Sequence, residues 1–356
     1  MASVVRYVVD TYTDIMENKS DPRVKDWPLM SGPLPTVLIC LSYAFIVKVL
    51  GPKLMDKRKP FQLRKTLIVY NLLQVILSAW LFYESIMAGW FTTYSFRCQP
   101  VDYSNSPKAL RTAAGCWWYF FSKFTEFFDT FFFVLRKKNE QVSRLHVIHH
   151  GVMPLSTWFG VKFSPGGHST FFGMLNTFVH IVMYSYYLLA AFGPQMQKYL
   201  WWKKYLTALQ MVQFVLVMVH AFQLLFIDCN YPKAFAWWIG LHAIMFYFLF
   251  ADFYKQAYAK RDAKARAALA KKNEDAMLNG KSNSNGYTNG SVKGHTNGYA
   301  NGISNGFSNG TANGKTLSNG VNGVYSEPEK GMESSYTTQD SLRTRAFINK
   351  DQSKTS

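Results

Sequence analysis

Three histidines lie close together at the start of an apolar stretch of the chain. They are His146, His149 and His150, and spacings of three and four residues place them on one face of a helix. An imidazole can ligate a metal, transfer a proton near neutral pH, or attack a carbonyl carbon as a nucleophile. Such a cluster at the edge of an apolar segment indicates a reactive site rather than ordinary packing.

Three charged residues occur within another apolar stretch, upstream of the histidines. Lys123, Glu126 and Asp129 stand among many aromatic residues, and at helical spacing they fall within roughly 120° of one face. Neighbours three residues apart can neutralise and hydrogen-bond one another. Two interpretations remain open: a functional site, or a buried ionic staple that only fixes helix packing.

Two further apolar stretches carry polar residues at helical spacing. Asn176 and His180 share a face with Tyr184 and Tyr187, and Gln210 and Gln213 form a stripe further along the chain. Polar groups inside apolar helices are costly unless they face a protein interior or a water-filled cavity. The four polar stretches together therefore predict a lined cavity.

The elements that must hold these residues are apolar helices. Of the 356 residues 49% are hydrophobic, and the stretches long enough to cross a bilayer are residues 34–50, 66–91, 117–135, 146–163, 170–192, 205–227 and 234–254. The sequence therefore predicts an all-α polytopic membrane protein with seven transmembrane helices.

The net charge of +18 is distributed in a way that agrees with this topology. Basic residues are abundant in alternate loops, at 51–65, 136–144, 198–204 and 255–272, and sparse in the loops between them. The positive-inside rule then places the N-terminus outside the cytosol and the C-terminus inside it. Because the basic residues flank apolar segments, the charge does not call for a nucleic-acid partner.

The chain divides into three predicted regions. A lumenal N-terminal segment covers 1–33, a seven-span domain covers 34–258, and a cytosolic tail covers 259–356. The tail is basic at first and then rich in Asn-Gly repeats. It is too polar to bury a core, which predicts disorder.

Two features belong to the predicted lumenal side. Asn18 begins an Asn-Lys-Ser acceptor for N-glycosylation. Cys98 and Cys229 both fall in lumenal loops, where an oxidising compartment permits pairing. We predict a disulfide between these two cysteines; the alternative is two free thiols.

The basic loops on the predicted cytosolic side suit a polyanionic ligand at the mouth of the cavity. The candidate residues are Arg136, Lys137, Lys138, Lys203 and Lys204, with Tyr184, Tyr187 and Gln210 further in. The remaining wall of Phe, Leu, Met and Tyr suits a long apolar chain, and a ligand with both properties is an acyl-coenzyme A. Alternatively, the basic residues only mark topology.

The ordered set of motifs resembles the very-long-chain fatty acid elongases, the condensing enzymes of microsomal fatty acid elongation. The motifs are Gly51-Pro52-Lys53-Leu54-Met55 with Arg58-Lys59-Pro60-Phe61, Lys123-x-x-Glu126-x-x-Asp129-Thr130, His146-x-x-His149-His150, Asn176-x-x-x-His180-x-x-Met183-Tyr184-x-Tyr186-Tyr187, Thr207-x-x-Gln210-x-x-Gln213-Phe214, and Phe253-Tyr254 followed by Tyr258. The match covers about residues 20–260 and looks closest to the animal branch acting on saturated and monounsaturated long chains. The Asn-Gly tail and the chain end, which is not a dilysine retrieval signal, depart from the family pattern.

The resemblance implies a multi-pass enzyme of the endoplasmic reticulum membrane. It would condense a long-chain acyl-CoA with malonyl-CoA to a two-carbon-longer 3-oxoacyl-CoA, releasing CO2 and CoA. Six of the spans would form a barrel around an acyl-chain tunnel, and neither a metal nor a cofactor is implied beyond the CoA substrates. The expected functional partners are a ketoacyl-CoA reductase, a hydroxyacyl-CoA dehydratase and an enoyl-CoA reductase, and a homo-oligomer is plausible.

A ping-pong mechanism is the interpretation most consistent with these residues. His149 would attack the thioester and hold the acyl chain as an acyl-imidazole. The other candidate catalytic residues are His146, His150 and His180 for proton management or enolate stabilisation, Asn176 and Gln213 as donors to developing oxyanions, Glu126 and Asp129 to orient histidines, and Lys123 to balance the carboxylates.

This assignment carries a geometric condition. His180 lies about twelve residues, roughly 18 Å, from the cytosolic end of its span, whereas His149 lies only a few residues into its own. The two can meet only if the fourth span begins earlier than its apolar run and the loop over 136–145 dips inward, which we expect.

Two other classes of protein share some of these features. A diiron membrane desaturase or hydroxylase also uses a three-histidine box, but it needs several such boxes to ligate its iron, and this chain has one box among eight histidines. A seven-span receptor or transporter fits the topology, but it does not explain a histidine box beside buried Lys, Glu and Asp.

Overall fold

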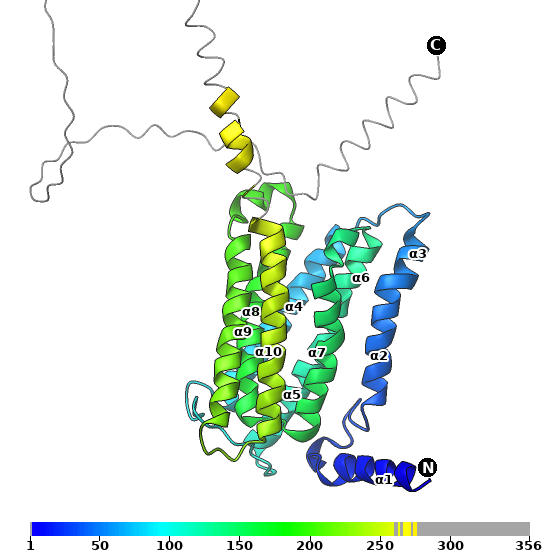
Figure 1. Ribbon diagram of the computed structural model, residues 1–356, viewed down its shortest axis with the longest axis vertical. Helices are drawn as coiled ribbons and strands as arrows, with labels where there is room; N and C mark the ends of the chain where they lie inside the picture. The colour runs from blue at the N-terminus through cyan, green and yellow to red at the C-terminus, as the bar shows by residue number, and fades with distance from the viewer. Residues whose placement is uncertain (1, 260–262, 264–265, 272, 276–356) are drawn as a thin grey trace, which may run out of the picture. The chain divides into compact units, whose positions relative to one another are not determined.

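The computed structural model describes residues 2–259, 263, 266–271 and 273–275. The greater part of the predicted cytosolic tail, including its Asn-Gly repeats, lies outside the described residues. Within them all regular structure is helical (Figure 1). The α-helices are α1 (Ala2–Thr13), α2 (Leu34–Phe45), α3 (Gly51–Met55), α4 (Arg64–Ala88), α5 (Pro107–Thr125), α6 (Phe127–Leu135), α7 (Arg144–Phe163), α8 (Thr170–Ala191), α9 (Lys203–Phe222) and α10 (Lys233–Tyr254).

Helices occupy all seven of the apolar ranges, with two differences from the prediction. The first helix is longer than its apolar run, because α2 continues through the π-helical turn Ile46–Leu50 into α3. The third range is divided, because α5 ends at Thr125 and α6 begins at Phe127. The residue between these two helices is Glu126.

Local sequence signals set several helix ends. Ser106 Oγ accepts the backbone N–H of Ala109, and Ser143 Oγ accepts that of His146, both at 3.2 Å. These bonds satisfy N–H groups that the first turns of α5 and α7 leave without helical partners. Gly193 follows the end of α8 with φ at 98°, a backbone conformation that glycine adopts without strain.

Five helices are long and apolar enough to cross a membrane, so the chain is a polytopic membrane protein. They are Leu34–Met55, Arg64–Ala88, Gly167–Ala191, Lys203–Leu225 and Lys233–Tyr258. α5 and α7 carry charged residues and histidines and are not among these five, and α6, at nine residues, is too short to cross a membrane by itself. The total of seven spans therefore stays a prediction.

Pairwise contacts between six helices close into a cycle. α4 contacts α8, α8 contacts α9, α9 contacts α10, α10 contacts α7, α7 contacts α5, and α5 contacts α4. α2 packs on α7 and is not one of the six (Figure 1). Long-range packing thus brings helices from both halves of the chain around a common interior.

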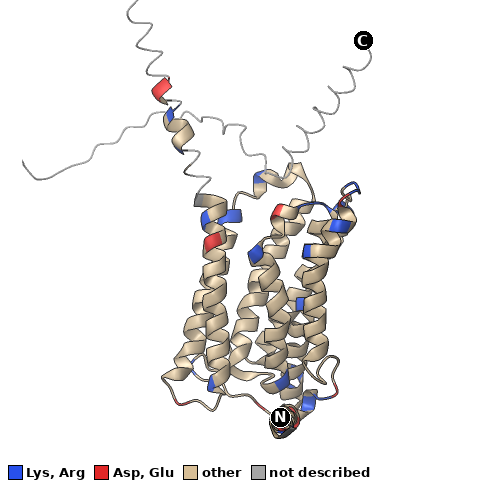
Figure 2. Cartoon of the chain, turned by 45° about the vertical axis from the view of Figure 1, so that its right-hand side comes forward, with Lys and Arg blue, Asp and Glu red and all other residues tan. Residues whose placement is uncertain are grey.

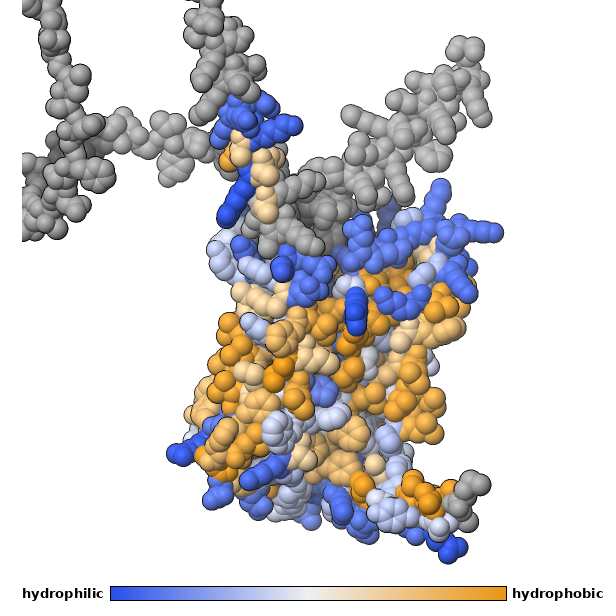
Figure 3. All heavy atoms as spheres, in the orientation of Figure 1, coloured by the Kyte–Doolittle hydropathy of each residue, from blue (hydrophilic) through white to orange (hydrophobic). Residues whose placement is uncertain are grey.

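The outward faces of the helices are apolar. Large exposed hydrophobic side chains include Leu38 and Leu41 on α2, Val69, Leu73 and Ile76 on α4, Val212, Leu216 and Val219 on α9, and Leu241 and Phe248 on α10. Figure 3 shows this apolar surface between two hydrophilic ends, and Figure 2 shows Lys and Arg gathered mainly towards those ends. Such a surface matches a hydrocarbon slab between two aqueous phases.

A disulfide lies at one end of the helices. Cys98, in the α4–α5 connection, is bonded to Cys229, in the α9–α10 connection, with their Cα atoms 5.7 Å apart. These are the two cysteines that the sequence pairs, and Cys40 and Cys116 are free thiols. We call this end the disulfide end, and the opposite end, with the 136–143 and 192–202 connections, the basic end.

The segment before α2 is attached to the helices at the disulfide end. Three side chains donate to three consecutive carbonyl oxygens of this segment: Trp117 to Pro28 at 3.0 Å, Trp158 to Leu29 at 2.8 Å and Lys162 to Met30 at 3.0 Å. The region predicted over 1–33 therefore packs on α5 and α7. Asn18 is exposed within it and donates to Asp14 Oδ1 at 3.0 Å.

Candidate functional site

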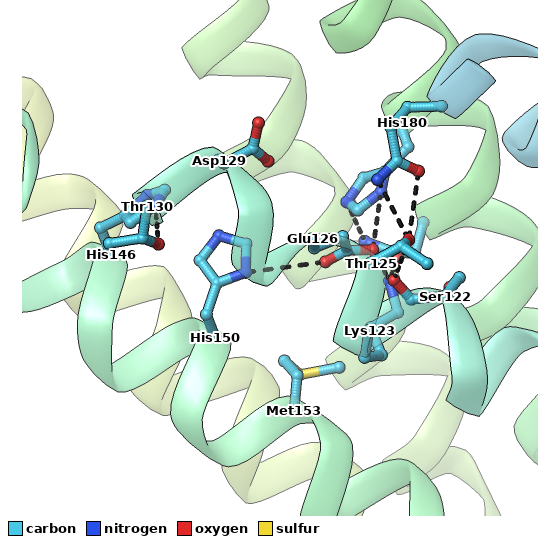
Figure 4. A network of polar contacts seen from close by, with 12 residues as sticks. Ser122, Lys123, Thr125, Glu126, Asp129, Thr130, His146, His150, Met153 and His180 are labelled. Atoms are coloured by element: carbon cyan, nitrogen blue, oxygen red, sulfur yellow. Dashed lines mark hydrogen bonds and ion pairs between the residues drawn. The ribbon is translucent and has the colours of Figure 1, made fainter. Parts of the chain in front are cut away.

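The break between α5 and α6 places a buried ion pair at the centre of the site. Glu126 Oε1 lies 2.5 Å from Lys123 Nζ, and each side chain is only 2% exposed. Two charges at this depth persist only when they are paired and hydrogen-bonded. The helix end at Thr125 frees Glu126 from the regular α5 backbone and directs it towards α7 and α8 (Figure 4).

Asn176 of α8 connects this pair to a histidine. Its Oδ1 accepts hydrogen bonds from Lys123 Nζ at 3.0 Å and from Tyr119 OH at 2.8 Å. The amide oxygen is therefore fixed on that side, and Nδ2 must be the atom that lies 3.3 Å from His180 Nε2.

The direction of this bond sets the tautomer of His180. An amide nitrogen only donates, so His180 Nε2 accepts and the neutral ring carries its proton on Nδ1. His180 Nδ1 faces Glu126 Oε1 at 3.3 Å (Figure 4). The sequence suggested an orienting role for Glu126, and this role stays a prediction that the 3.3 Å contact supports.

The histidine box reaches the same carboxylate from α7. His150 Nδ1 lies 3.8 Å from Glu126 Oε2, too far for a hydrogen bond but close enough for electrostatic attraction. His146 Nε2 lies 2.9 Å from Thr130 Oγ1 on α6. The rings of His146 and His150 are 4.3 Å apart between centroids, so the N-terminal turns of α7 face α6.

His149 has a different environment from its two neighbours. Its ring packs against Phe246 and Phe250 of α10, with centroids 4.8 and 6.2 Å away, and lies 5.1 Å from the ring of His150. Within the described part of the chain neither ring nitrogen of His149 has a hydrogen-bond partner, and the side chain is half-buried. The box therefore divides into two histidines that face α6 and one that faces α10.

Asp129 has a partner other than the expected histidine. Its Oδ2 accepts the hydroxyl of Tyr184 at 2.7 Å, and it contacts no histidine among the described residues. Tyr184 is fully buried, whereas Tyr187 is 37% exposed on the outer side of the same helix. Of the four residues predicted to share one face of this helix, Asn176, His180 and Tyr184 are buried, and Tyr187 is partly exposed.

The polar stripe of α9 lies apart from the network around Glu126. Gln213 is buried at 4% exposure, and its Oε1 has no hydrogen-bond partner in the described residues. Gln210 Nε2 contacts Met183 Sδ at 3.5 Å. Neither amide contacts a site histidine, so their role in the site stays a prediction.

The connection before α7 dips inward, as the depth of His180 required. α7 begins at Arg144, and His146 meets Thr130, five residues before the end of α6. Val142 in the connection is buried, and its carbonyl accepts a hydrogen bond from Lys48 Nζ at 3.1 Å. The histidine box therefore starts well inside the helices rather than at their basic end.

The predicted CoA-binding residues lie at the basic end. Arg136, Lys137 and Lys138 are half-buried in the α6–α7 connection, and Lys203 and Lys204 are exposed in the first turn of α9. Lys137 has a positive φ of 54°, and its Nζ donates to the carbonyl of Asp56 at 2.9 Å.

Two tyrosines of the site escaped the sequence analysis. Tyr119 lies one turn before Lys123, so the helical spacing alone was enough to include it. Tyr43 donates or accepts a hydrogen bond at Thr130 Oγ1, 2.8 Å away, but it lies on α2 and no local spacing links it to α6. Among the described residues no three His, Cys, Asp or Glu side chains come together in a way that would hold a metal ion.

The family to which the chain belongs follows from comparison with known proteins. Residues 28–266 match the ELO (GNS1/SUR4) family model. The chain is 71% identical to very long chain fatty acid elongase 7 of Drosophila melanogaster over 261 residues, 73% of this chain and 79% of that protein. It is 56% identical to elongase 7 of Rattus norvegicus over 68% of this chain and 86% of that protein, and 49% identical to elongase 1 of Homo sapiens over 73% and 94%. The chain belongs to the ELO family.

Proposed function

We propose that this elongase performs the condensing step of very-long-chain fatty acid elongation by ping-pong catalysis through an acyl-histidine at His149. The observation that carries the proposal is the contrast within the histidine box. His146 is hydrogen-bonded to Thr130 and His150 lies 3.8 Å from the Glu126 carboxylate, while the His149 ring has neither a hydrogen bond nor a carboxylate within 4 Å in the described residues. A neutral imidazole with an unengaged nitrogen is a competent nucleophile.

The first half-reaction transfers the acyl group to the protein. The free ring nitrogen of His149 attacks the thioester carbonyl of a long-chain acyl-CoA, and a C–N bond replaces the C–S bond. The departing CoA thiolate takes the proton that the acylated imidazole loses. Phe246 and Phe250 beside the ring exclude water, which would otherwise hydrolyse the acyl-imidazole.

The second half-reaction forms the carbon–carbon bond. Malonyl-CoA loses CO2, the resulting enolate carbon attacks the acyl carbonyl, and the C–N bond to His149 breaks. His149 leaves as an imidazolate and takes up one proton, so the products are CO2 and a 3-oxoacyl-CoA two carbons longer. His150 is the proposed group for enolate stabilisation, and His180, positioned by Asn176 and Glu126, is the proposed group for proton management.

The architecture proposed for this reaction is a six-helix barrel around an acyl-chain tunnel, with α2 outside it as a seventh span. The closed cycle of contacts among α4, α5, α7, α8, α9 and α10 supports the barrel. We further propose that the basic end faces the cytosol, where Arg136, Lys137, Lys138, Lys203 and Lys204 meet the CoA phosphates. The disulfide end then faces the lumen of the endoplasmic reticulum.

The product requires further enzymes. A 3-oxoacyl-CoA must be reduced, dehydrated and reduced again before it can re-enter condensation. We therefore propose a ketoacyl-CoA reductase, a hydroxyacyl-CoA dehydratase and an enoyl-CoA reductase as functional partners in the same membrane.

The test is a comparison of histidine variants of the purified protein. Wild type incubated with a long-chain acyl-CoA alone should gain the mass of one acyl group, which peptide mapping places on His149, and with malonyl-CoA should release the 3-oxoacyl product. His149→Ala should form neither adduct nor product. His242→Ala is the matched control, because His242 Nδ1 is hydrogen-bonded within α10 to the carbonyl of Trp238 at 2.8 Å and the ring has no polar contact with the network around Glu126 among the described residues.

Two outcomes would contradict the proposal in different ways. Product formation by His149→Ala at wild-type rate would remove the acyl-histidine and leave direct condensation. Absence of any 3-oxoacyl product from wild type, together with iron-dependent oxidation of the acyl chain, would instead establish a diiron oxygenase.

A further inference from the structure

A hydrogen-bonded chain links the outer helix α2 to the histidine box. Tyr43 OH lies 2.8 Å from Thr130 Oγ1, and the same oxygen lies 2.9 Å from His146 Nε2. Tyr43 is 1% exposed and Thr130 is fully buried. The ring of Tyr43 is stacked on Phe127 with centroids 4.1 Å apart, so its hydroxyl is held in place.

The direction of this chain follows from counting protons. The Thr130 hydroxyl has one proton and two lone pairs, and Tyr43 and His146 are its two partners among the described residues. It donates to one and accepts from the other, because accepting from both would leave its own buried proton without an acceptor. If His146 Nε2 carried the proton, Thr130 would donate to Tyr43, and the Tyr43 proton would need another acceptor. Among the described residues Tyr43 OH has no second partner, and a buried donor without an acceptor costs about 1–3 kcal/mol.

The opposite direction leaves no fully buried donor without an acceptor, because the one unpaired donor then belongs to His146, whose side chain is only half-buried, whereas Tyr43 is 1% exposed. Tyr43 donates to Thr130, Thr130 donates to His146 Nε2, and the neutral His146 ring carries its proton on Nδ1. His146 Nδ1–H then has no partner in the described part of the chain, although the ring lies beside His150. It is a hydrogen-bond donor available to a substrate oxygen.

We propose that Tyr43 and Thr130 are positioning residues that fix His146 as its Nδ1–H tautomer, so that His146 donates to the oxygen of the reacting carbonyl. This inference rests on the proposed condensation at the histidine box. The helix α2, which is not one of the six helices in the contact cycle, would then position a residue of the histidine box through Tyr43. No proton is transferred along the chain; only the orientation of two hydroxyl groups is set.

A double-mutant cycle tests the coupling between the two positions. Tyr43→Phe keeps the ring stack and removes the first donor, so kcat for condensation should fall about two- to tenfold with KM for acyl-CoA unchanged. Thr130→Val should lower kcat at least as far, and Tyr43→Phe should have no added effect in that background. Thr130→Ser restores the hydroxyl and should return kcat to near wild type, and Tyr247→Phe on α10 should change nothing.

A second measurement reads the tautomer without turnover. In protein labelled with nitrogen-15 histidine, the His146 signals, identified by their loss in His146→Gln, should show an unprotonated Nε2 and a protonated Nδ1. In Tyr43→Phe this preference should weaken. Additive effects of Tyr43→Phe and Thr130→Val, failure of Thr130→Ser to restore kcat, or a protonated Nε2 would each overturn the inference.

These results test the role of Tyr43 and Thr130 separately from the proposed function. If wild type forms no adduct on His149, the ping-pong proposal fails while the nitrogen-15 signals still decide the tautomer. If the adduct forms and the effects of Tyr43→Phe and Thr130→Val on kcat are additive, the positioning role of Tyr43 and Thr130 is rejected and the acyl-histidine stands.

Discussion

At the scale of single residues, the side chains of the site differ in whether a hydrogen bond or an ion pair fixes their orientation. Lys123, Asn176 and Glu126 form a buried network that fixes His180. His149 is the member of the box that has neither a hydrogen bond nor a carboxylate within 4 Å among the described residues, whereas His146 is bonded to Thr130 and His150 lies 3.8 Å from Glu126. Their helical spacing was visible in the sequence, but the partner of each side chain was not, because partners come from helices far apart in the chain.

The buried ion pair gives a prediction about stability. Lys123→Met leaves Glu126 buried without its partner and should lower the stability by about 3–5 kcal/mol. Lys123→Met combined with Glu126→Gln removes both charges and should recover most of the thermal unfolding midpoint, while both variants stay inactive. The measurement is thermal unfolding of the detergent-solubilised protein.

The control for this prediction is a second ion pair at an exposed position. Arg111 Nε lies 2.7 Å from Glu84 Oε2, with the arginine side chain 46% exposed. Arg111→Met should shift the unfolding midpoint only slightly, because water screens an exposed ion pair. If Lys123→Met and Arg111→Met shift the midpoint equally, burial does not govern the Lys123–Glu126 pair.

At the scale of elements, apolar runs predicted where helices lie but not where they are interrupted. The run over 117–135 gave no sign of the break at Glu126, because the flanking residues favour a helix equally well on both sides. The inward connection before α7 was predictable only by requiring His149 and His180 to meet at one depth. Ser143 was the visible local signal for the start of α7, through its capping bond.

The two serine caps of α5 and α7 allow the positioning of the histidine box to be tested separately from the stability of the protein. Ser143→Ala and Ser106→Ala each remove one capping bond of 3.2 Å, so each should lower the stability by about 1 kcal/mol. Only Ser143→Ala loosens the turn that carries His146, so it alone should lower kcat for condensation. Equal kcat values for the two variants would show that the box does not depend on this cap.

At the scale of the whole molecule, the five helices that are long and apolar enough to cross a membrane do not include the helices that carry the site. α5 carries Lys123, α7 carries the histidine box, and the break at Glu126 leaves α6 only nine residues long. In the contact cycle, α5 and α7 lie between α4 and α10, two helices that are long and apolar enough to cross a membrane. The role of α2 was not predictable, because no spacing connects Tyr43 to Thr130.

Sidedness provides the last prediction. Arg23 donates to the carbonyls of Asp102 and Ser104 at 2.9 and 2.7 Å, so the segment that carries Asn18 and the loop that carries Cys98 face the same compartment. In sealed microsomes Asn18 should carry a glycan, and the Cys98–Cys229 bond should resist an impermeant reductant until detergent is added. A cysteine introduced by Glu140→Cys at the basic end should react at once with an impermeant maleimide, whereas the unmodified chain should not. Glu140→Cys labelling only after permeabilisation would reverse the assigned topology, because the two ends of the helices cannot face the same side.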